Sequence, residues 1–389
     1  MNKFDVCVIG AGASGSLLAI LLAKGGKKVC IVDRFDVPAK KILVTGNGRC
    51  NITNTNMSSE FYNQNIDAYL SQFGYEDAKN QFAEFGLDIY ADEMGRCYPI
   101  SNSAKTVQFI LNHHIQQNNV HFVNAEVLDV EKLQKMNADF EYSVICNQQN
   151  IVADKIVFAC GINNFSIAML NKFGIKYKNV LPSLVALKTK QITKRLEGER
   201  ISDVQVTAEI GDKKAAQVGE VLFKDKGLSG ISIFNISAFF AKNGAYNGKI
   251  FINLLPKWQK NEISQKINAN MSIFKNVHNS LRCMFSKELS SEILRRADIS
   301  KDNVFLTAKE VETIAQIVSN FEFDVIGAYL NNQVQSGGVC LEGLTSHLQS
   351  KSNVNMYFCG EICDVDGICG GYNLQWAWTS ANLVAKDIL

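Results

Sequence analysis

The sequence has almost no net charge and no segment suited to a membrane. It contains 40 Lys and Arg against 38 Asp and Glu, for a net charge of +2, which gives the whole chain no strong attraction to nucleic acid or anionic lipid. An apolar stretch near the start is interrupted by Gly10, Gly12 and Gly15, which argues against a span of about 20 apolar residues. No segment has the charged and apolar pattern of a signal peptide. We therefore expect a soluble, cytoplasmic protein with no membrane partner.

A cysteine framework is also missing. The eleven cysteines are an odd number without regular spacing, which suits thiols in a reducing compartment. Cys359, Cys363 and Cys369 lie close in sequence, but no His or Cys pair with zinc-type spacing accompanies them. The adjacent His113 and His114 would point apart on a helix. We expect no metal site.

The two ends of the chain have the pattern of a nucleotide-binding domain. Residues 4–9 and 28–33 are apolar runs typical of buried parallel strands, and residues 14–24 between them favour a helix. This is a βαβ unit. Near the C-terminus, residues 355–359 predict another strand and residues 373–388 a closing helix.

The middle of the chain has a different character. Residues 204–210 and 219–223 alternate in polarity and predict antiparallel strands. Helical periodicity predicts helices over 68–85, 105–117, 259–270, 287–297 and 308–319. A length of 389 residues allows two or three domains. The simplest layout is an α/β nucleotide-binding domain built from both ends and interrupted by a β-rich and helical insertion.

A dinucleotide fingerprint joins the first predicted strand to its helix. The run Gly10-Ala11-Gly12-Ala13-Ser14-Gly15 has the G-x-G-x-x-G spacing, and Asp33 follows 18 residues after the last glycine. The first glycine makes the turn, the second admits a pyrophosphate, and the third lets helix and strand pack closely. The helix N-terminus attracts phosphate, and Asp33 would accept from a ribose hydroxyl. A tight turn without a ligand is the alternative, and the run alone does not distinguish FAD from NAD.

Two further segments extend this site. The loop over residues 40–54 is rich in glycine and amide side chains and carries Arg49, which suits a polyanionic ligand. Residues 360–375 lie between the last predicted strand and the last helix, so they present a second helix N-terminus. Two dinucleotide-binding segments hundreds of residues apart are characteristic of FAD, which is long enough to cross a whole domain.

The Gly46-Asn-Gly-Arg-Cys-Asn51-Ile-Thr-Asn54 loop and the run from Gly360 to Trp378 resemble those of the BaiN/YhiN-type flavoproteins. Residues 95–99, 227–230 and 253–256 are similar to further signatures of that family, so the resemblance covers nearly the whole chain. It implies a glutathione-reductase-like, Rossmann-type FAD domain over 1–182 and 336–389. It also implies an inserted β-barrel-like domain over 183–256, with 322–335 as an optional extension, and a small helical domain over 257–321.

The fingerprint, the two further segments and the resemblance together give one set of cofactor-binding residues, in which Val127 would meet the adenine through its backbone. The set is Gly10, Gly12, Ala13, Ser14, Gly15, Asp33, Arg34, Lys41, Thr45, Gly46, Asn47, Gly48, Arg49, Cys50, Asn51, Val127, Cys160, Gly161, Gly360, Glu361, Asp364, Gly371, Tyr372, Asn373, Leu374 and Gln375.

The resemblance implies redox chemistry with several possible substrates. Family members have been linked to reduction of activated C=C bonds in bile-acid intermediates and in an rRNA uridine, and a relative to oxidation of aminoacetone. Members usually carry a second glycine and a long Gly/Ser-rich loop after the turn at Gly161, whereas this chain passes at once into residues 165–173. That difference puts the family's substrate in doubt for this chain.

Reduction of a C=C bond needs a proton donor besides the flavin. The candidates are Cys50, Tyr372 and Tyr98. Cys50 comes first, because the neighbouring Arg49 would lower the pKa of its thiol, although a packing role is the alternative. Arg49 would stabilise an anionic intermediate or contact a phosphate. A flavin disulfide reductase would need two cysteines in this loop, and the loop contains only Cys50.

The insertion has no second G-x-G-x-x-G run, so NAD(P)H, if it is the electron donor, docks transiently at the flavin. Residues 181–260 hold 13 Lys and Arg against 7 Asp and Glu, a surplus of six. That surplus suits a polyanionic substrate such as rRNA, or it is a solvated Lys-rich surface.

We expect an FAD-dependent reductase of a C=C bond, in an rRNA uracil or a small enone. The alternatives are a flavin oxidase of a small amine or alcohol, and a flavin-binding protein without turnover. The oligomeric state stays open.

Overall fold

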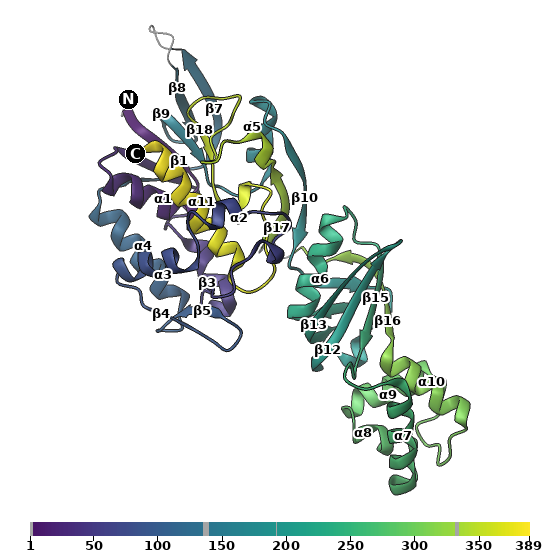
Figure 1. The fold of residues 1–389 in the computed structure, drawn as a ribbon. Helices are drawn as coiled ribbons and strands as arrows, with labels where there is room; N and C mark the ends of the chain where they lie inside the picture. The colour runs from purple at the N-terminus through teal and green to yellow at the C-terminus, as the bar shows by residue number, and fades with distance from the viewer. Residues whose placement is uncertain (1–2, 135–139, 192, 331–333) are drawn as a thin grey trace. The chain divides into compact units, whose positions relative to one another are not determined.

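The computed structural model describes residues 3–134, 140–191, 193–330 and 334–389. The chain divides into two compact units (Figure 1): unit 1 is Met1–Leu181 with Gln335–Leu389, and unit 2 is Pro182–Val334. Residues 331–333, part of the optional 322–335 extension, lie outside the described residues. Among the described helices, none has the length and hydrophobicity needed to cross a bilayer.

Unit 1 is built on a seven-stranded sheet in the order β6-β2-β1-β9-β8-β7, with β18 also paired to β9. The strands are β1 Lys3–Ile9, β2 Val29–Asp33, β6 His121–Asn124, β7 Val127–Gln134, β8 Phe140–Cys146, β9 Asn150–Phe158 and β18 Met356–Phe358. Strands β6, β2, β1, β9 and β18 are parallel, whereas β7 and β8 form an antiparallel extension. Because β18 comes from the C-terminal segment, both ends of the chain complete one sheet, as the pattern predicted.

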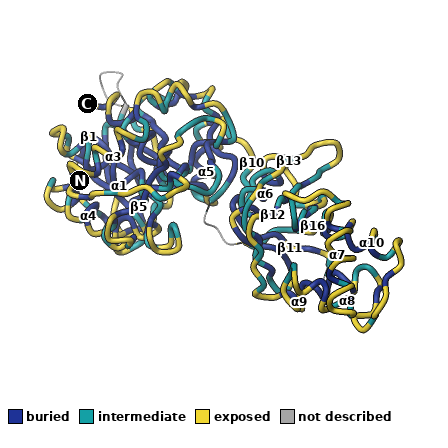
Figure 2. The backbone as a smooth tube through the Cα atoms, turned by 60° about the horizontal axis from the view of Figure 1, so that its bottom comes forward, coloured by how far each residue is buried: buried dark blue, intermediate teal, exposed yellow. Residues whose placement is uncertain are grey.

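Three helices pack together beside this sheet: α1 Ala13–Lys24, α4 Ala104–Gln117 and α11 Tyr372–Ile388. Figure 1 shows the yellow α11 lying along the purple α1, although their sequences are more than 340 residues apart. Figure 2 shows dark blue buried residues in the interior of this unit and yellow exposed residues along its periphery. The buried parallel strands explain the unbroken apolar runs in the sequence.

Smaller elements surround the carboxyl ends of the parallel strands. They are the 3-10 segment η1 Lys40–Gly48, the three-stranded sheet of β3 Thr53–Asn54, β5 Arg96–Pro99 and β4 Ile89–Ala91, the helices α2 Asp67–Leu70, α3 Tyr75–Glu84 and α5 Asn164–Lys172, and the pair β10 Tyr177–Ser183 and β17 Val334–Val339.

The single helix predicted over 68–85 is wrong. The chain turns between α2 and α3, where the backbone N–H of Gly74 donates to the carboxylate of Asp77 at 2.8 Å and α3 begins. Glycine at the N-cap and an acidic residue in the first turn are start signals for a helix, and here they divide a continuous periodic pattern into two helices.

Unit 2 contains a closed barrel in the order β11-β14-β13-β12-β15-β16. Its strands are β11 Leu187–Thr189, β12 Arg200–Ile210, β13 Lys213–Lys224, β14 Gly227–Ser229, β15 Gly248–Asn253 and β16 Phe321–Ala328. The helices α7 Lys260–Phe274, α8 Val277–Arg282, α9 Lys287–Arg296 and α10 Ala308–Ser319 lie between β15 and β16 in the chain. They share one hydrophobic core with the barrel. The predicted α/β class with an inserted barrel is confirmed.

Helix α6 Ile231–Lys242 packs on strands β12, β13 and β14 and had no clear signal in the sequence. Its run Ile231-Ser-Ile-Phe-Asn-Ile-Ser-Ala-Phe-Phe is apolar nearly throughout. Short apolar runs rich in β-branched residues do not distinguish a buried helix from a strand, so burial against the barrel decided its conformation.

Gln375 in α11 joins the two ends of unit 1 inside the core. Its side chain is 0% exposed. The hydroxyl of Thr53 donates to its Oε1 at 2.6 Å, and its Nε2 donates to the hydroxyl of Thr379 at 3.1 Å. A buried donor that loses its acceptor destabilises a fold more than a lost surface contact does.

We expect Gln375→Leu to lower the free energy of unfolding by about 2 kcal/mol, because the buried hydroxyl of Thr53 loses its acceptor. Urea denaturation of the purified protein measures this. The matched control is Gln81→Leu, which removes a half-buried amide pair with Asn382 on the same side of unit 1, and it should cost less than about 1 kcal/mol. Equal losses in the two variants would contradict the assignment.

Candidate functional site

The fingerprint turn between β1 and α1 has room for a ligand at one glycine only. Gly10 has φ +106°, and a Cβ there would lie 2.6 Å from Cα of Cys160. A Cβ on Gly15 would lie 1.9 Å from the carbonyl oxygen of Gly10. At Gly12, by contrast, the nearest atom to a Cβ is the carbonyl oxygen of Ala159 at 4.0 Å. The first and third glycines are therefore required by chain packing, and the second leaves the open approach that a pyrophosphate needs.

Asp33 at the end of β2 anchors this turn. Its Oδ2 accepts from the backbone N–H of Ala11 at 2.7 Å, and its Oδ1 accepts from the N–H of Phe35 at 2.9 Å. Its carbonyl oxygen accepts from the N–H of Ala125 at 2.9 Å. That bond brings the end of β6, and Val127 two residues later, beside the end of β2. Arg34 is exposed and lies over the ring of Phe35.

The loop of residues 40–51 forms a compact turn rather than an extended surface loop. Gly46, Asn47 and Cys50 have positive φ angles of 54°, 55° and 60°. The N–H of Cys50 donates to the carbonyl of Thr45 at 3.1 Å, and the hydroxyl of Thr45 donates to the carbonyl of Ile42 at 2.7 Å. Left-handed residues turn successive backbone groups toward one side, which is the geometry of an anion-binding nest.

The predicted effect of Arg49 on Cys50 is wrong. The guanidinium of Arg49 lies 4.3 Å from the ring centroid of Tyr98, and its Nη2 donates to the Tyr98 hydroxyl at 3.3 Å. The Cys50 side chain is 0% exposed, and burial raises the pKa of its thiol to about 12. Adjacent residues of this turn point to different surroundings, so the cation does not act on the thiol. Cys50 packs in the core of unit 1, and Arg49 is exposed.

The start of α11 meets the 40–54 segment at Gly371. Gly371 has φ +98°, and a Cβ there would lie 2.4 Å from the carbonyl oxygen of Thr53 and 2.9 Å from Oδ1 of Asn51. That Oδ1 is buried and has no hydrogen-bond partner among the described residues. Asn54 Nδ2 donates to the carbonyl of Gly370 at 2.9 Å. An unsatisfied buried acceptor beside a helix N-terminus is expected where a ligand completes the hydrogen bonding.

Glu361 lies where the C-terminal segment meets the end of β9. A Cβ on Gly161 would lie 3.2 Å from its Oε2, and the N–H of Gln335 donates to its Oε1 at 3.1 Å. Burial raises the pKa of its carboxyl, and the charge of Lys41 opposes this effect. Nearby, a Cβ on Gly360 would lie 2.3 Å from the hydroxyl oxygen of Ser14. The structure thus brings the fingerprint, the 40–54 loop and the C-terminal segment together.

Three predicted residues have side chains that the protein itself uses. Asp364 is buried, forms an ion pair with Lys178 at 2.6 Å and accepts from Asn63 Nδ2 at 3.0 Å. The amide of Asn373 bonds to the N–H and carbonyl of Gly367 at 2.9 and 2.8 Å. Gln375 is fully bonded in the core, as described above. Side chains of these three residues hold the C-terminal segment in place, and only their backbone is available to a cofactor.

Of the other predicted residues, Ala13 begins α1, Asn47 and Gly48 lie in the exposed part of the 40–54 loop, and Leu374 packs against the core of unit 1.

Sequence reasoning missed the residues that hold the C-terminal segment. The hydroxyl of Tyr62 donates to the carbonyl of Tyr372 at 2.8 Å, and Nε1 of Trp376 donates to the carbonyl of Gly360 at 3.0 Å. Asn63 contacts Asp364 across 301 residues of sequence. The tryptophans of the terminal motif were a usable signal, because a buried indole N–H needs an acceptor. For Tyr62 and Asn63, the sequence offered no comparable signal.

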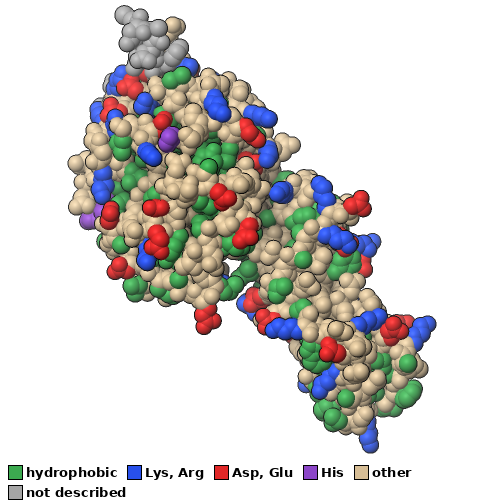
Figure 3. Space-filling view, viewed as in Figure 1, with side chains coloured by type: hydrophobic (Ala, Val, Ile, Leu, Met, Phe, Trp, Pro, Cys, Tyr) green, Lys and Arg blue, Asp and Glu red, His purple; other side chains and the backbone are tan. Residues whose placement is uncertain are grey.

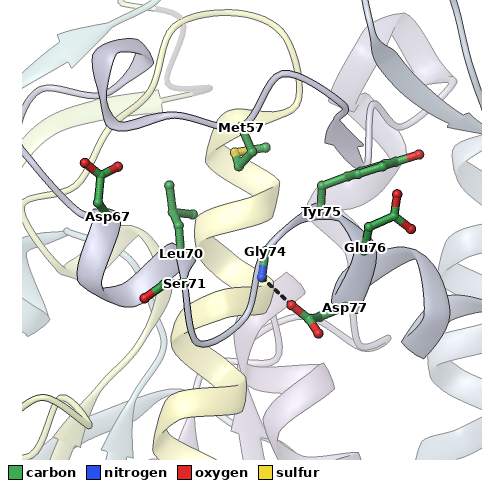
Figure 4. Close-up of a pocket in the computed structure, with 8 residues that line it drawn as sticks. All are labelled: Met57, Asp67, Leu70, Ser71, Gly74, Tyr75, Glu76 and Asp77. Carbon is green, nitrogen blue, oxygen red and sulfur yellow. Dashed lines mark hydrogen bonds between the residues drawn. The ribbon is translucent and has the colours of Figure 1, made fainter.

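A surface hollow of about 420 Å³ lies beside α2 and α3. Figure 4 shows Asp67, Glu76 and Asp77 around it together with the apolar Met57 and Leu70. Three carboxylates disfavour a phosphate ligand, and none of the predicted cofactor residues lines it. In the described part of the chain, no three His, Cys, Asp or Glu residues are placed to hold a metal ion.

The residues at the junction of the three segments fit a flavin dinucleotide. The space over Gly12 and the N-terminus of α1 suit its two phosphates, and the end of β2 at Asp33 suits its ribose. The orphan acceptor of Asn51 and the N-terminus of α11 lie together on a second segment. A helix N-terminus there favours negative charge on a reduced flavin ring.

Comparison with known families matches residues 4–387 to the HI0933-like protein Rossmann domain. The chain belongs to this family. The 3-dehydro-bile acid delta(4,6)-reductase of Clostridium scindens is 30% identical, over 99% of this chain and 98% of that protein. The ribosomal RNA dihydrouridine synthase of Escherichia coli is 27% identical, over 100% of this chain and 99% of that protein. The predicted resemblance is confirmed, and this member of the HI0933-like family is an FAD-dependent oxidoreductase.

A solved structure shares the fold. The 3-ketosteroid delta1-dehydrogenase of Sterolibacterium denitrificans aligns over 100% of both chains with a TM-score of 0.51 and 12% identity. The agreement supports the Rossmann-type architecture of this HI0933-like protein.

We expect Asp33→Asn to weaken FAD binding roughly tenfold to a hundredfold, because a carboxylate that accepts two backbone N–H bonds becomes a neutral amide. Quenching of flavin fluorescence on titration of the apoprotein with FAD measures the dissociation constant. The control is Asp36→Asn, at a position three residues after Asp33. It removes an exposed ion pair between Asp36 and Lys40 and should leave FAD binding unchanged. An unchanged dissociation constant in Asp33→Asn would refute the role of Asp33.

Proposed function

We propose that this oxidoreductase passes hydride to an activated C=C bond, and that the bond belongs to a uracil of ribosomal RNA. The proposal depends on one observation: two relatives with different substrates are named for the same type of reaction. One is named as a delta(4,6)-reductase of a 3-dehydro bile acid, and the other as a dihydrouridine synthase. Both names describe the saturation of a C=C bond conjugated to a carbonyl group. The second name recurs for a relative from Haemophilus influenzae at 27% identity.

FAD bound at the junction supplies the hydride. The protein then has to hold the substrate carbonyl, stabilise the negative charge that develops on it, and deliver a proton to the neighbouring carbon. Arg49 is exposed, and its stacking on Tyr98 fixes the direction of the guanidinium. We assign it to the developing enolate-like charge, a role in which a planar pair of donors suits a carbonyl oxygen.

Tyr372 replaces Cys50 as the proposed proton donor. Its ring is 4% exposed and packs against Phe61 with a centroid distance of 4.8 Å. Burial raises the pKa of its hydroxyl to about 12, so the group carries its proton at neutral pH. Among the described residues none accepts a hydrogen bond from this hydroxyl, which leaves it available to a substrate. Cys50 is enclosed and has no such access.

The electron donor would be NAD(P)H. It would dock transiently at the flavin, because the insertion has no fingerprint for a second dinucleotide. The reaction would take place in the cytoplasm, where rRNA is found and where the eleven free thiols of the chain would stay reduced.

We expect protein-free rRNA, lacking this modification, to reoxidise the reduced enzyme under anaerobic conditions, with dihydrouridine detected by mass spectrometry of the digested RNA. Flavin absorbance gives the rate. The specific control is the same RNA with the enzyme held oxidised, which should form no dihydrouridine. Rapid reoxidation by O₂ with an amine or alcohol substrate, and none by rRNA, would favour a flavin oxidase instead. If the protein binds FAD but no substrate reoxidises the reduced flavin, the protein has no turnover.

We expect Tyr372→Phe to slow single-turnover reoxidation by substrate by about a hundredfold or more, because general-acid catalysis contributes on that scale. FAD binding should be unchanged, since the ring still packs on Phe61. Cys50→Ser is the matched control, an isosteric change of a thiol that does not reach the substrate, and its rate should equal that of the unaltered enzyme. A slow Cys50→Ser enzyme together with a fast Tyr372→Phe enzyme would reverse the assignment.

A further inference from the structure

Two groups of cations on the barrel differ in their partners. On the face shown in Figure 3, positive and negative side chains are interspersed over both units, and three barrel cations follow that pattern: Arg200, Lys214 and Lys249 each form an ion pair with a glutamate. The second group forms no ion pair with any carboxylate in the described residues of the barrel. It consists of Lys188, Lys190, Lys194, Arg195, Lys224 and Lys226, named here the barrel cation patch.

Strand pairing brings this patch together. Lys188 on β11 and Lys224 on β13 both pair with Gly227 on β14, one from each side. The hydroxyl of Thr193 donates to the carbonyl of Lys224 at 2.6 Å, which fixes the following 3-10 turn, η3 Lys194–Leu196, beside the same strand ends. Four carboxylates, those of Glu197, Glu199, Asp225 and Asp324, lie on the same or paired chain segments, and none forms an ion pair with a patch residue in the described structure. Asp324 accepts from Gln191 at 2.9 Å.

A tyrosine ring stands in the patch. The backbone N–H of Tyr329 donates to the carbonyl of Ala186 at 2.9 Å, which places the residue directly after β16 and beside β11. The ammonium groups of Lys188 and Lys224 lie 5.4 and 5.3 Å from the centroid of its half-buried ring. Lys188 is flanked on both neighbouring strands by glycine, at Gly227 and Gly327. The positions that pair with Lys188 on β14 and β16 therefore carry no side chain.

An aromatic ring with unpaired cations around it is the recognition chemistry of single-stranded nucleic acid. Every base can stack on such a ring, and ammonium groups bind the phosphates on either side. The two lysines are held over the ring only by weak cation–π attraction, so a stacking base displaces them toward phosphates, which are stronger partners. An uncharged metabolite would use neither the six positive charges nor their spread over three chain segments.

We propose that the barrel cation patch binds a single-stranded segment of the RNA substrate, with a base stacked on Tyr329 and its flanking phosphates held by Lys188 and Lys224. The identification of the strand as RNA rests on the proposed function. In the sequence, the patch lies next to both chain crossings between the units: Lys188 follows Leu181 by seven residues and Tyr329 precedes Gln335 by six.

The test uses the FAD-loaded full-length protein and a fluorescein-labelled, uridine-rich 12-nucleotide RNA, with binding measured by fluorescence anisotropy at several salt concentrations. We expect Lys188→Gln with Lys224→Gln to raise the dissociation constant at least tenfold and to reduce the slope of log affinity against log salt by about 1.4, for two lost phosphate contacts on a single strand. Lys214→Gln with Lys249→Gln makes the same change in net charge at paired lysines, and it should change binding less than threefold.

Tyr329→Leu separates stacking from charge. It should raise the dissociation constant roughly fivefold to a hundredfold and leave the salt slope unchanged, because the lost contact involves no counterion. Equal affinities in the patch and control variants would overturn the proposal. Binding of phosphatidylserine vesicles with the same dependence on Lys188, Lys224 and Tyr329 would also overturn it, in favour of a lipid surface.

The binding assay needs no turnover, so the two proposals fail separately. Patch-dependent RNA binding without any dihydrouridine would leave the patch in place and remove the proposed reaction. Dihydrouridine formed equally well by the patch variants and the unaltered enzyme would remove the patch and leave the reaction.

Discussion

The close approach of α11 to the β3 segment at Gly371 is the constraint on which unit 1 depends. No side chain fits there, since a Cβ would lie 2.4 Å from the carbonyl oxygen of Thr53. The two segments are more than 300 residues apart in sequence, and buried hydrogen bonds such as the one from Thr53 to Gln375 hold them together. Because the same junction contains the orphan acceptor of Asn51, the contact that closes the fold also forms part of the candidate cofactor site.

This arrangement separates the motif residues that bond within the protein from the groups that stay available to a ligand. Gln375, Asn373 and Asp364 have side chains that bond within the protein and keep the C-terminal segment in position. Gly12, Asn51 and the free N–H groups at the starts of α1 and α11 are the parts left available to a ligand. Positioning a long cofactor through backbone and helix ends demands a rigid scaffold, and the buried side chains supply it.

Unit 2 differs from unit 1 in its core and in its surface charges. Its barrel and helices share one hydrophobic core, which is distinct from the core of unit 1. Some cations of its barrel form ion pairs with glutamates, whereas the cations of the barrel cation patch, which form no ion pair in the described residues, lie at the strand ends around Tyr329. Unpaired like charges repel one another, and a surface that tolerates them is suited to an anionic ligand that relieves the repulsion.

Much of this protein could be predicted from its sequence because the decisive signals are local. The glycine spacing from Gly10 to Gly15, the acid at Asp33 and the apolar strand runs identified a Rossmann-type dinucleotide-binding domain, since turn geometry and strand burial depend on neighbouring residues. The motifs at 40–54 and 360–375 then favoured FAD as its cofactor. Tertiary structure alone decided the rest. The burial of Cys50, the stacking of Arg49 on Tyr98, the break between α2 and α3 and the grouping of unpaired lysines around Tyr329 depend on residues far apart in the chain. A pKa, an ion pair or a buried surface depends on which atoms are in contact in the folded chain, and sequence spacing does not specify those contacts.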